Sequence, residues 1–136
     1  MSYRRGSVVK GPDLFADNEF RPYVRLNDET HPFHDEEGLY AAVTSTERPI
    51  AIRLRAADFE TGGLPRRSYV NPWTIAPLRT ADVRGVEGQL TVATTDTVGC
   101  KSLKILASTG WRESPHSYSR QYDRIATRAA GYLGVE

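Results

Sequence analysis

The sequence predicts a mainly β (α+β) protein, a small barrel or sandwich of short strands with short helices and a helix towards its C-terminal end. Short apolar runs recur along the first hundred residues, separated by turn residues, as is typical of barrels and sandwiches. In one run Ile50, Ile52 and Leu54 point one way, and Arg53 and Arg55 point the other. Extended helical spacing is found only near the end of the chain.

Six strands are expected in chain order, each bounded by turn residues. They cover residues 6–10, 21–26, 39–44, 50–54, 68–78 and 88–92. The third is continuously apolar and rich in strand formers, which indicates a buried strand. In the fifth, Pro72 and Pro77 mark an edge or a bulge, because proline has no N–H to donate. Between the strands, loops are expected at residues 27–38 and 62–65, and one helical turn at residues 57–59.

Two helices are expected after the last strand. The first covers residues 94–107, where the period is irregular and Gly99 weakens it. The second follows Ser114 and Pro115, which fit an N-cap and a first-turn proline. Tyr118 and Tyr122 then begin a series at helical spacing. We therefore divide the chain into a barrel domain, residues 1–108, and a C-terminal helical extension, residues 109–136.

Composition narrows the class of protein. The chain has 136 residues, of which 39% are hydrophobic and 26% charged, as in an ordinary soluble globular protein. Its single cysteine, Cys100, excludes an internal disulfide and a multi-cysteine zinc site, and we expect it to be a small buried residue. No apolar run approaches the roughly 20 residues of a membrane span. Residues 1–10 are too polar for a secretory signal, so a cytoplasmic location is expected.

Four segments, in this order and spacing, resemble the MazF/PemK family of toxin ribonucleases. They are Arg5–Val9 (RGSVV), Phe20–Leu26 (FRPYVRL), Leu39–Thr46 (LYAAVTST) and Leu78–Val83 (LRTADV). An Arg-Pro pair opening the second strand, a strand ending in Val-Thr-Ser, and a late Leu-Arg-Thr-x-Asp turn form the skeleton of that family. The resemblance covers residues 4–92 and implies an SH3-like barrel of the MazF type.

The resemblance assigns catalytic roles to Arg21 and Thr44. The chemistry of these residues agrees, because cleaving RNA requires no metal or cofactor if the substrate's own 2′-hydroxyl attacks the adjacent phosphate. The protein must then stabilise the negative charge that develops on the phosphoryl oxygens. A guanidinium at a strand start and a hydroxyl at a neighbouring strand end can both donate hydrogen bonds to that phosphate. The alternatives are a surface salt bridge from Arg21 to Glu19 or Asp17, and a buried strand threonine.

No residue is clearly marked as the general acid or base. Several family members have a carboxylate shortly before the Leu-Arg-Thr turn, whereas residues 74–77 here contain none. Glu19 is one candidate. His31 and His34 are others, because histidine titrates near neutrality and their loop is expected near the cleft. A metal site built from the two histidines and residues 35–37 is the less favoured alternative, and a plain solvated loop is another.

Arginine outnumbers lysine 15 to 3, which fits either a base-composition bias of the genome or contact with phosphates. The candidates for RNA contact are basic residues close to aromatic ones, since bases stack while phosphates pair. They are Arg53, Arg55, Arg66 and Arg67, with the aromatic Trp73, and the resemblance to the family adds Ser68. The alternative is solvated charge and core aromatics. Arg79 is expected to have a structural role, tied to Asp82.

The resemblance implies the toxin of a toxin–antitoxin pair, a metal-independent endoribonuclease that cleaves single-stranded mRNA. It would leave a cyclic phosphate and a 5′-hydroxyl, form a homodimer, and bind a cognate antitoxin. Two alternatives remain, because a fold does not determine function. CcdB-type proteins have the same barrel and bind DNA gyrase without catalysis, and a non-catalytic binding module descended from a toxin is the other.

Overall fold

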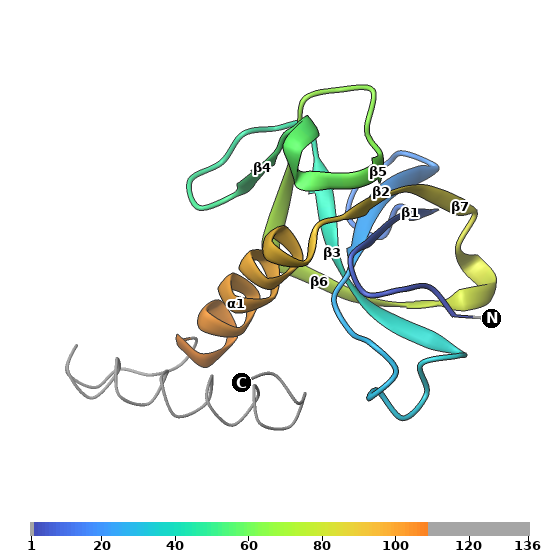
Figure 1. The fold of residues 1–136 in the computed structure, drawn as a ribbon. Coiled ribbons are helices and arrows are strands. Elements are labelled where there is room, and N and C mark those ends of the chain that lie inside the picture. The colour runs from blue at the N-terminus through green and yellow to red at the C-terminus, as the bar shows by residue number, and fades with distance from the viewer. Residues whose placement is uncertain (1, 109–136) are drawn as a thin grey trace.

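A computed structural model describes residues 2–108, which fold into one curled, seven-stranded antiparallel sheet with an α-helix packed against it (Figure 1). The strands are β1 (Ser7–Pro12), β2 (Phe20–Arg25), β3 (Glu37–Thr44), β4 (Ile52–Leu54), β5 (Phe59–Gly62), β6 (Ser68–Arg79) and β7 (Gly85–Leu90). The helices are α1 (Val92–Ser108) and the 3-10 turns η1 (Ala56–Asp58) and η2 (Thr80–Asp82). The architecture is mainly β and barrel-like, as the sequence predicted.

The strand order in the sheet is β4-β6-β3-β2-β1-β7-β5. Strands β1, β2 and β3 form its centre as consecutive antiparallel neighbours. The long β6 pairs along the whole of β3 and carries β4 on its other side. At the opposite edge, β7 pairs with β1, and β5 pairs with β7.

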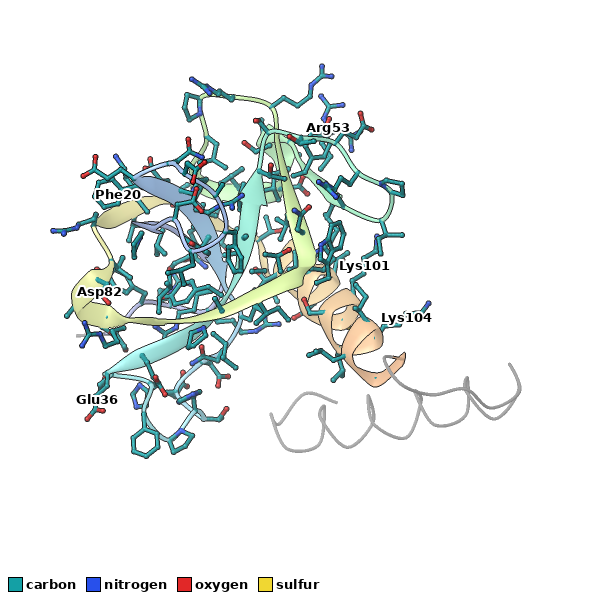
Figure 2. All side chains as sticks on the ribbon, turned by 180° about the vertical axis from the view of Figure 1, so that it is seen from behind. Phe20, Glu36, Arg53, Asp82, Lys101 and Lys104 are labelled. Carbon is teal, nitrogen blue, oxygen red and sulfur yellow. The ribbon has the colours of Figure 1, made fainter. Side chains whose placement is uncertain are left out.

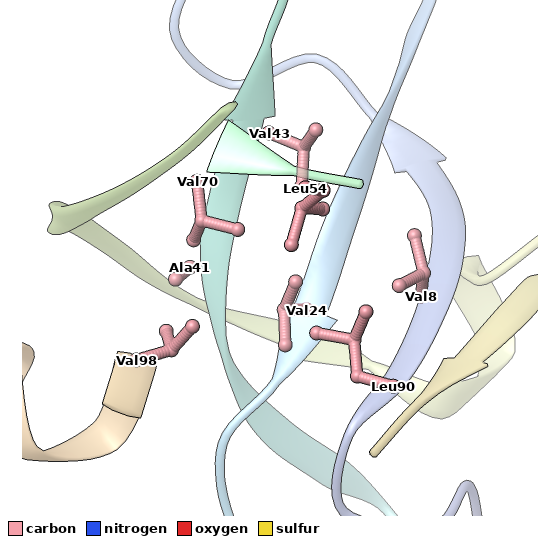
Figure 3. Packing of buried hydrophobic residues seen from close by; sticks show 8 residues of the cluster. All are labelled: Val8, Val24, Ala41, Val43, Leu54, Val70, Leu90 and Val98. Atoms are coloured by element: carbon pink, nitrogen blue, oxygen red, sulfur yellow. The ribbon is translucent and has the colours of Figure 1, made fainter. Parts of the chain in front are cut away.

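Both faces of the central strands are buried because the sheet curls on itself. One cluster of buried side chains lies inside the curl and includes Val98 of α1 (Figure 3). Its members are Val8, Val24, Ala41, Val43, Leu54, Val70, Leu90 and Val98. The alternate residues of the same strands form a second cluster on the other face, around Tyr23 and Tyr40. Burial on both faces explains why residues 39–44 read as a continuous apolar run.

The predicted strands are all present, with shifted ends. Strand β5 was missed, because Phe59–Gly62 is short and has no apolar alternation. Strand β4 begins at Ile52, since Ile50 has a φ of 64° and is 61% exposed. The prolines of β6 lie as predicted. Pro72 is within an irregularity between Asn71 and Ile75, and Pro77 lies beyond the end of β4, where that side of β6 is an edge.

Two expectations for the C-terminal region have different outcomes. Helix α1 is present but begins at Val92, two residues earlier than predicted. Cys100 was expected to be buried and is exposed, because it lies on the side of α1 that faces away from the sheet. The predicted helix after Ser114 falls outside the described residues. Within residues 2–108, no helix has the length and apolar character needed to cross a membrane.

Candidate functional site

A cleft of about 360 Å³ opens at the end of the barrel where β2 begins and β3 ends. The loop between β5 and β6 forms one wall, and β1 and β7 form the other. Its lining combines basic, hydroxyl and apolar side chains: Lys10, Asn18, Phe20, Arg21, Pro22, Val43, Thr44, Ser45, Leu64, Pro65, Arg66, Ser68 and Glu87. Both residues predicted to be catalytic, Arg21 and Thr44, are among them.

Arg21 and Thr44 lie at the adjoining ends of two neighbouring strands, two residues beyond the last pair of the β2–β3 ladder, Tyr23 with Ala42. Both line the same cleft, and Arg21 Nη2 reaches the carbonyl of Val43, the residue before Thr44. The fold thus brings together a guanidinium and a hydroxyl that are 23 positions apart in the chain.

The Arg21 guanidinium is held by hydrogen bonds to Asp13, just after the end of β1, and to Val43, near the end of β3. Its Nη1 donates to Asp13 Oδ1 at 3.3 Å, and its Nη2 donates to the Val43 carbonyl at 3.1 Å. The Phe15 ring lies 5.8 Å from the guanidinium carbon. The Arg21 side chain is 14% exposed, and its Nε is buried without a hydrogen-bond partner among the described atoms. The alternative reading for Arg21 was a salt bridge to Glu19 or Asp17, and the structure pairs Arg21 with Asp13.

Asp13 organises the loop between β1 and β2. Its carboxylate accepts hydrogen bonds from the backbone N–H groups of Phe15 and Ala16 and from the Asn18 side chain, besides the one from Arg21. Burial raises the pKa of Asp13, but these hydrogen bonds and the charge of Arg21 together hold the pKa below its usual value of 3.8. Asp13 is thus ionised near neutrality and is fully engaged, so it is a support for Arg21.

Within residues 2–108, the Thr44 hydroxyl accepts one hydrogen bond and donates none. Its Oγ1 accepts a hydrogen bond from the Thr46 N–H at 3.2 Å, which fixes the oxygen in a local turn. A hydroxyl has one donor and two acceptor positions, so the proton can be donated to a bound group. Thr44 is half-buried at the end of β3, and Ser45 next to it is exposed.

The predicted RNA-contact residues divide into two groups. Arg66 and Ser68 line the cleft, and Ser68 Oγ donates to the Arg66 carbonyl at 2.8 Å. Outside the lining are Arg53, Arg55, Arg67 and Trp73. Arg53 is nevertheless in the same cross-strand row as Thr44, because Thr44 pairs with Tyr69 and Tyr69 pairs with Arg53. Two strand spacings place its backbone roughly 10 Å from Thr44.

The loop of His31 and His34 was expected near the cleft and lies at the other end of the barrel. It joins the end of β2 to the start of β3, whereas the cleft is at the start of β2. In Figure 2, Glu36 in this loop and Phe20 in the cleft lining are at opposite ends. The buried Arg25 holds the loop by donating to the His34 carbonyl at 2.9 Å. Of residues 2–108, no three His, Cys, Asp or Glu side chains converge as a metal site would need.

Glu19 is exposed and does not line the cleft. Its carbonyl accepts the Asp13 N–H, which closes the β1–β2 loop, so its described role is a backbone one. Arg79 donates to Asp82 at 3.1 Å, as expected for a structural pair. It belongs to the Leu-Arg-Thr turn and does not line the cleft.

Sequence analysis missed two charged residues of the cleft, Lys10 and Glu87. Lys10 could have been found, because it is the polar residue that ends the apolar run of β1 on the same side as Val8. Glu87 had no comparable signal, since the start of β7 was placed after it.

No protein-family model and no curated protein matches the sequence, but solved structures match its fold. The endoribonuclease in complex with its cognate antitoxin from Mycobacterial species is 20% identical, with a TM-score of 0.59, and the match covers 81% of this chain and 97% of that chain. MazE-MazF from Deinococcus radiodurans is 16% identical, with a TM-score of 0.60 and coverage of 78% and 96%. Mycobacterium tuberculosis toxin MazF-mt6 is 16% identical, with a TM-score of 0.57 and coverage of 77% and 99%. The chain therefore has the fold of the MazF-type endoribonuclease toxins, as its sequence motifs implied.

Proposed function

We propose that this protein is the toxin of a toxin–antitoxin pair, a cytoplasmic endoribonuclease that cleaves single-stranded mRNA without a metal. The observation that carries the proposal is that Arg21 and Thr44 line one cleft, at the adjoining ends of β2 and β3. A 2′-hydroxyl of the RNA attacks the adjacent phosphorus, so the protein has to orient the phosphate and stabilise its added negative charge.

Arg21 and Thr44 supply those hydrogen bonds. One N–H of each terminal nitrogen of the guanidinium is used by Asp13 or Val43, and the second N–H of each remains for a phosphate, because each terminal nitrogen carries two. The two fixed contacts orient the guanidinium in advance, which lowers the cost of reorganisation in the transition state. The Thr44 proton serves as the second donor.

RNA binding follows from the charges around the cleft. Arg66 and Lys10 line it, and the exposed Arg53 continues the row that starts at Arg21 and Thr44. Basic groups spaced along such a row match the phosphates of one extended strand. We infer that the protein acts as a homodimer and is inhibited by its antitoxin. Two of the similar structures are described as complexes with an antitoxin or with MazE.

The test is incubation of the purified protein with a mixed RNA, with and without a chelator, followed by analysis of the product ends. We expect cleavage in both conditions, cyclic phosphate and 5′-hydroxyl ends, and a loss of about 100-fold or more for Arg21→Ala and for Thr44→Val. Arg79→Ala and Thr97→Val are matched controls, because both residues are exposed and outside the cleft. Equal activity of all four variants would reject the assignment.

A second candidate function is a non-catalytic binding module, and one observation favours it. The Arg21 guanidinium is already paired with the buried carboxylate of Asp13. In this candidate the role of Arg21 is structural, and it holds the β1–β2 loop. This candidate predicts no RNA cleavage by the wild type. For a CcdB-type binder, inhibition of DNA supercoiling by purified gyrase is the expected positive result.

A further inference from the structure

We propose that Glu87 is the general base of the cleft and that Lys10 donates the proton to the leaving group. This inference rests on the proposed ribonuclease function, and it supplies the acid–base pair that the family motifs do not provide in this chain. Neither residue belongs to those motifs. Both line the cleft that holds Arg21 and Thr44.

Glu87 is presented by a β-bulge. In the β1–β7 ladder Val8 pairs with Gly88, whereas Val9 pairs with Val86, so Glu87 is the extra residue between two registered pairs. A bulge leaves its extra residue outside the ladder and redirects its side chain. Glu87 is exposed and is one of the residues that line the cleft.

Two glycines, Gly62 and Gly88, allow the backbones of β5 and β7 to approach closely beside this bulge. Gly62 has a φ of 65°, and a Cβ there would collide with the Glu87 carbonyl. A Cβ on Gly88 would lie 2.8 Å from the Thr61 carbonyl oxygen. The Gly63 N–H donates to the Glu87 carbonyl at 3.2 Å. The loop that begins at Gly62 then continues into Leu64, Pro65 and Arg66, all in the cleft lining. The backbone around Glu87 is therefore fixed, and its side chain remains free.

Glu87 and Lys10 provide the two kinds of side chain that an acid–base pair requires. Glu87 is the one carboxylate among the lining residues, and Lys10 is the one amine. Neither takes part in an ion pair within the described part of the chain. The Lys10 Nζ lies 5.4 Å from the centre of the Phe20 ring. In an in-line displacement the attacking and leaving oxygens lie on opposite sides of phosphorus. The base and the acid therefore have to be separate groups that do not pair with each other.

The step balances without any other reactant. The Glu87 carboxylate takes the proton of the 2′-hydroxyl as the bond from the 2′-oxygen to phosphorus forms. The bond from phosphorus to the 5′-oxygen breaks, and the Lys10 ammonium gives its proton to that oxygen. The products are a 2′,3′-cyclic phosphate and a 5′-hydroxyl. Water then takes the proton from Glu87 and returns one to Lys10, with no change of oxidation state.

The experiment compares Glu87→Gln and Lys10→Met with the wild type on two RNA substrates. One substrate has the normal 5′-oxygen at the cleavage site, and the other has a 5′-bridging sulfur, a leaving group that needs no proton. Glu60→Gln is the matched control, because Glu60 is an exposed carboxylate on β5 outside the cleft. Circular dichroism and RNA binding by fluorescence anisotropy show whether each variant is folded and binds.

On the normal substrate we expect each cleft variant to lose about 100-fold or more in rate, with binding changed less than 5-fold for Glu87→Gln. The sulfur substrate should restore Lys10→Met to within about 5-fold of the wild type and should not restore Glu87→Gln.

Three results would overturn the inference. Unchanged rates in Glu87→Gln would remove the base, and a defect of Lys10→Met that persists with the sulfur substrate would remove the acid. In either case, loss of cleavage in Arg21→Ala and Thr44→Val would leave the proposed function standing. Absence of cleavage by the wild type would overturn the ribonuclease function and this inference together.

Discussion

At the scale of single residues, two arginines of β2 show how position determines role. Arg21 and Arg25 lie four residues apart on one face of the strand. Arg21 is at the cleft and has a carboxylate partner, Asp13. Arg25 is 1% exposed and donates to neutral oxygens, those of Asn27, His34 and Tyr40. The first is available to an anionic ligand, and the second supports a loop.

Replacing Asp13 with asparagine tests the support of Arg21. The folded-state pKa of Asp13 is lowered, so its contribution to stability is present above the unfolded pKa and is lost as the pH falls through the folded one. We expect Asp13→Asn to lower the free energy of unfolding by about 2 kcal/mol at pH 7, and to flatten its dependence on pH below about 4. Urea unfolding at pH 7 and at pH 3 measures both effects.

Asp17→Asn is the control for this change, because Asp17 is an exposed residue of the same loop. The wild type should lose more free energy of unfolding than Asp13→Asn when the pH falls from 7 to 3. Equal losses would show that the ionised carboxylate of Asp13 does not stabilise the fold.

At the scale of elements, irregularities in the sheet build the cleft. The β1–β7 bulge presents Glu87, and the close approach at Gly62 and Gly88 sets the β5–β6 loop beside it. In the β3–β6 ladder, the shift between Ala41 and Ala42 leaves Pro72, Trp73 and Thr74 outside the pairing. That shift bends the long β6 so that its first half pairs with β4 beside the cleft.

Gly62→Ala is expected to disturb the cleft from a distance. Alanine disfavours the positive φ at this position, and its Cβ would push the loop away from the Glu87 carbonyl. The expected cost is about 1–3 kcal/mol, measured as a lower melting temperature, together with slower RNA cleavage. Gly63→Ala is the matched control, since a Cβ there meets no atom within 4 Å. Equal melting temperatures of the two variants would contradict the close approach described above.

At the scale of the whole molecule, curling of the sheet provides one core and α1 closes it. The inner cluster draws on six strands and on Val98 of the helix (Figure 3). Helix α1 is also held at its start, where Arg5 Nη2 pairs with Asp96 Oδ1 at 2.9 Å. Burial of apolar side chains at this junction is what attaches the helix to the barrel.

Val98→Ala tests that attachment. Val98 is 0% exposed, so the substitution leaves a cavity, and we expect the free energy of unfolding to fall by about 2 kcal/mol. Val92 in the same helix is 66% exposed, so Val92→Ala should change the free energy of unfolding by about 0.5 kcal/mol or less. Both substitutions share the same gain in helix propensity. Denaturant unfolding measures the difference, and equal values would mean that α1 is not docked as described.

Much of the fold was readable from local sequence. The apolar runs and turn residues predicted six of the seven strands, because strand periodicity and turn chemistry act over a few residues. The meeting of Arg21 and Thr44 was also predictable, since the start of one strand and the end of its antiparallel neighbour share an edge. The same reasoning explains the error over His31 and His34. A loop that joins two antiparallel strands lies at the end away from the first strand's start.

The sequence by itself predicted six of the seven strands and the placing of Arg21 and Thr44 at neighbouring strand ends, because each depends on short-range patterns or on neighbours along the chain. Only the tertiary structure decided which carboxylate holds Arg21, that Lys10 and Glu87 share its cleft, and that Arg25 is buried with Asn27, His34 and Tyr40 as its hydrogen-bond partners. The shared placement of Lys10 and Glu87, for example, depends on the register of β7 against β1 and on the one residue that falls out of that register. Register is set by long-range pairing and by the packing of both faces at once, which no local pattern records.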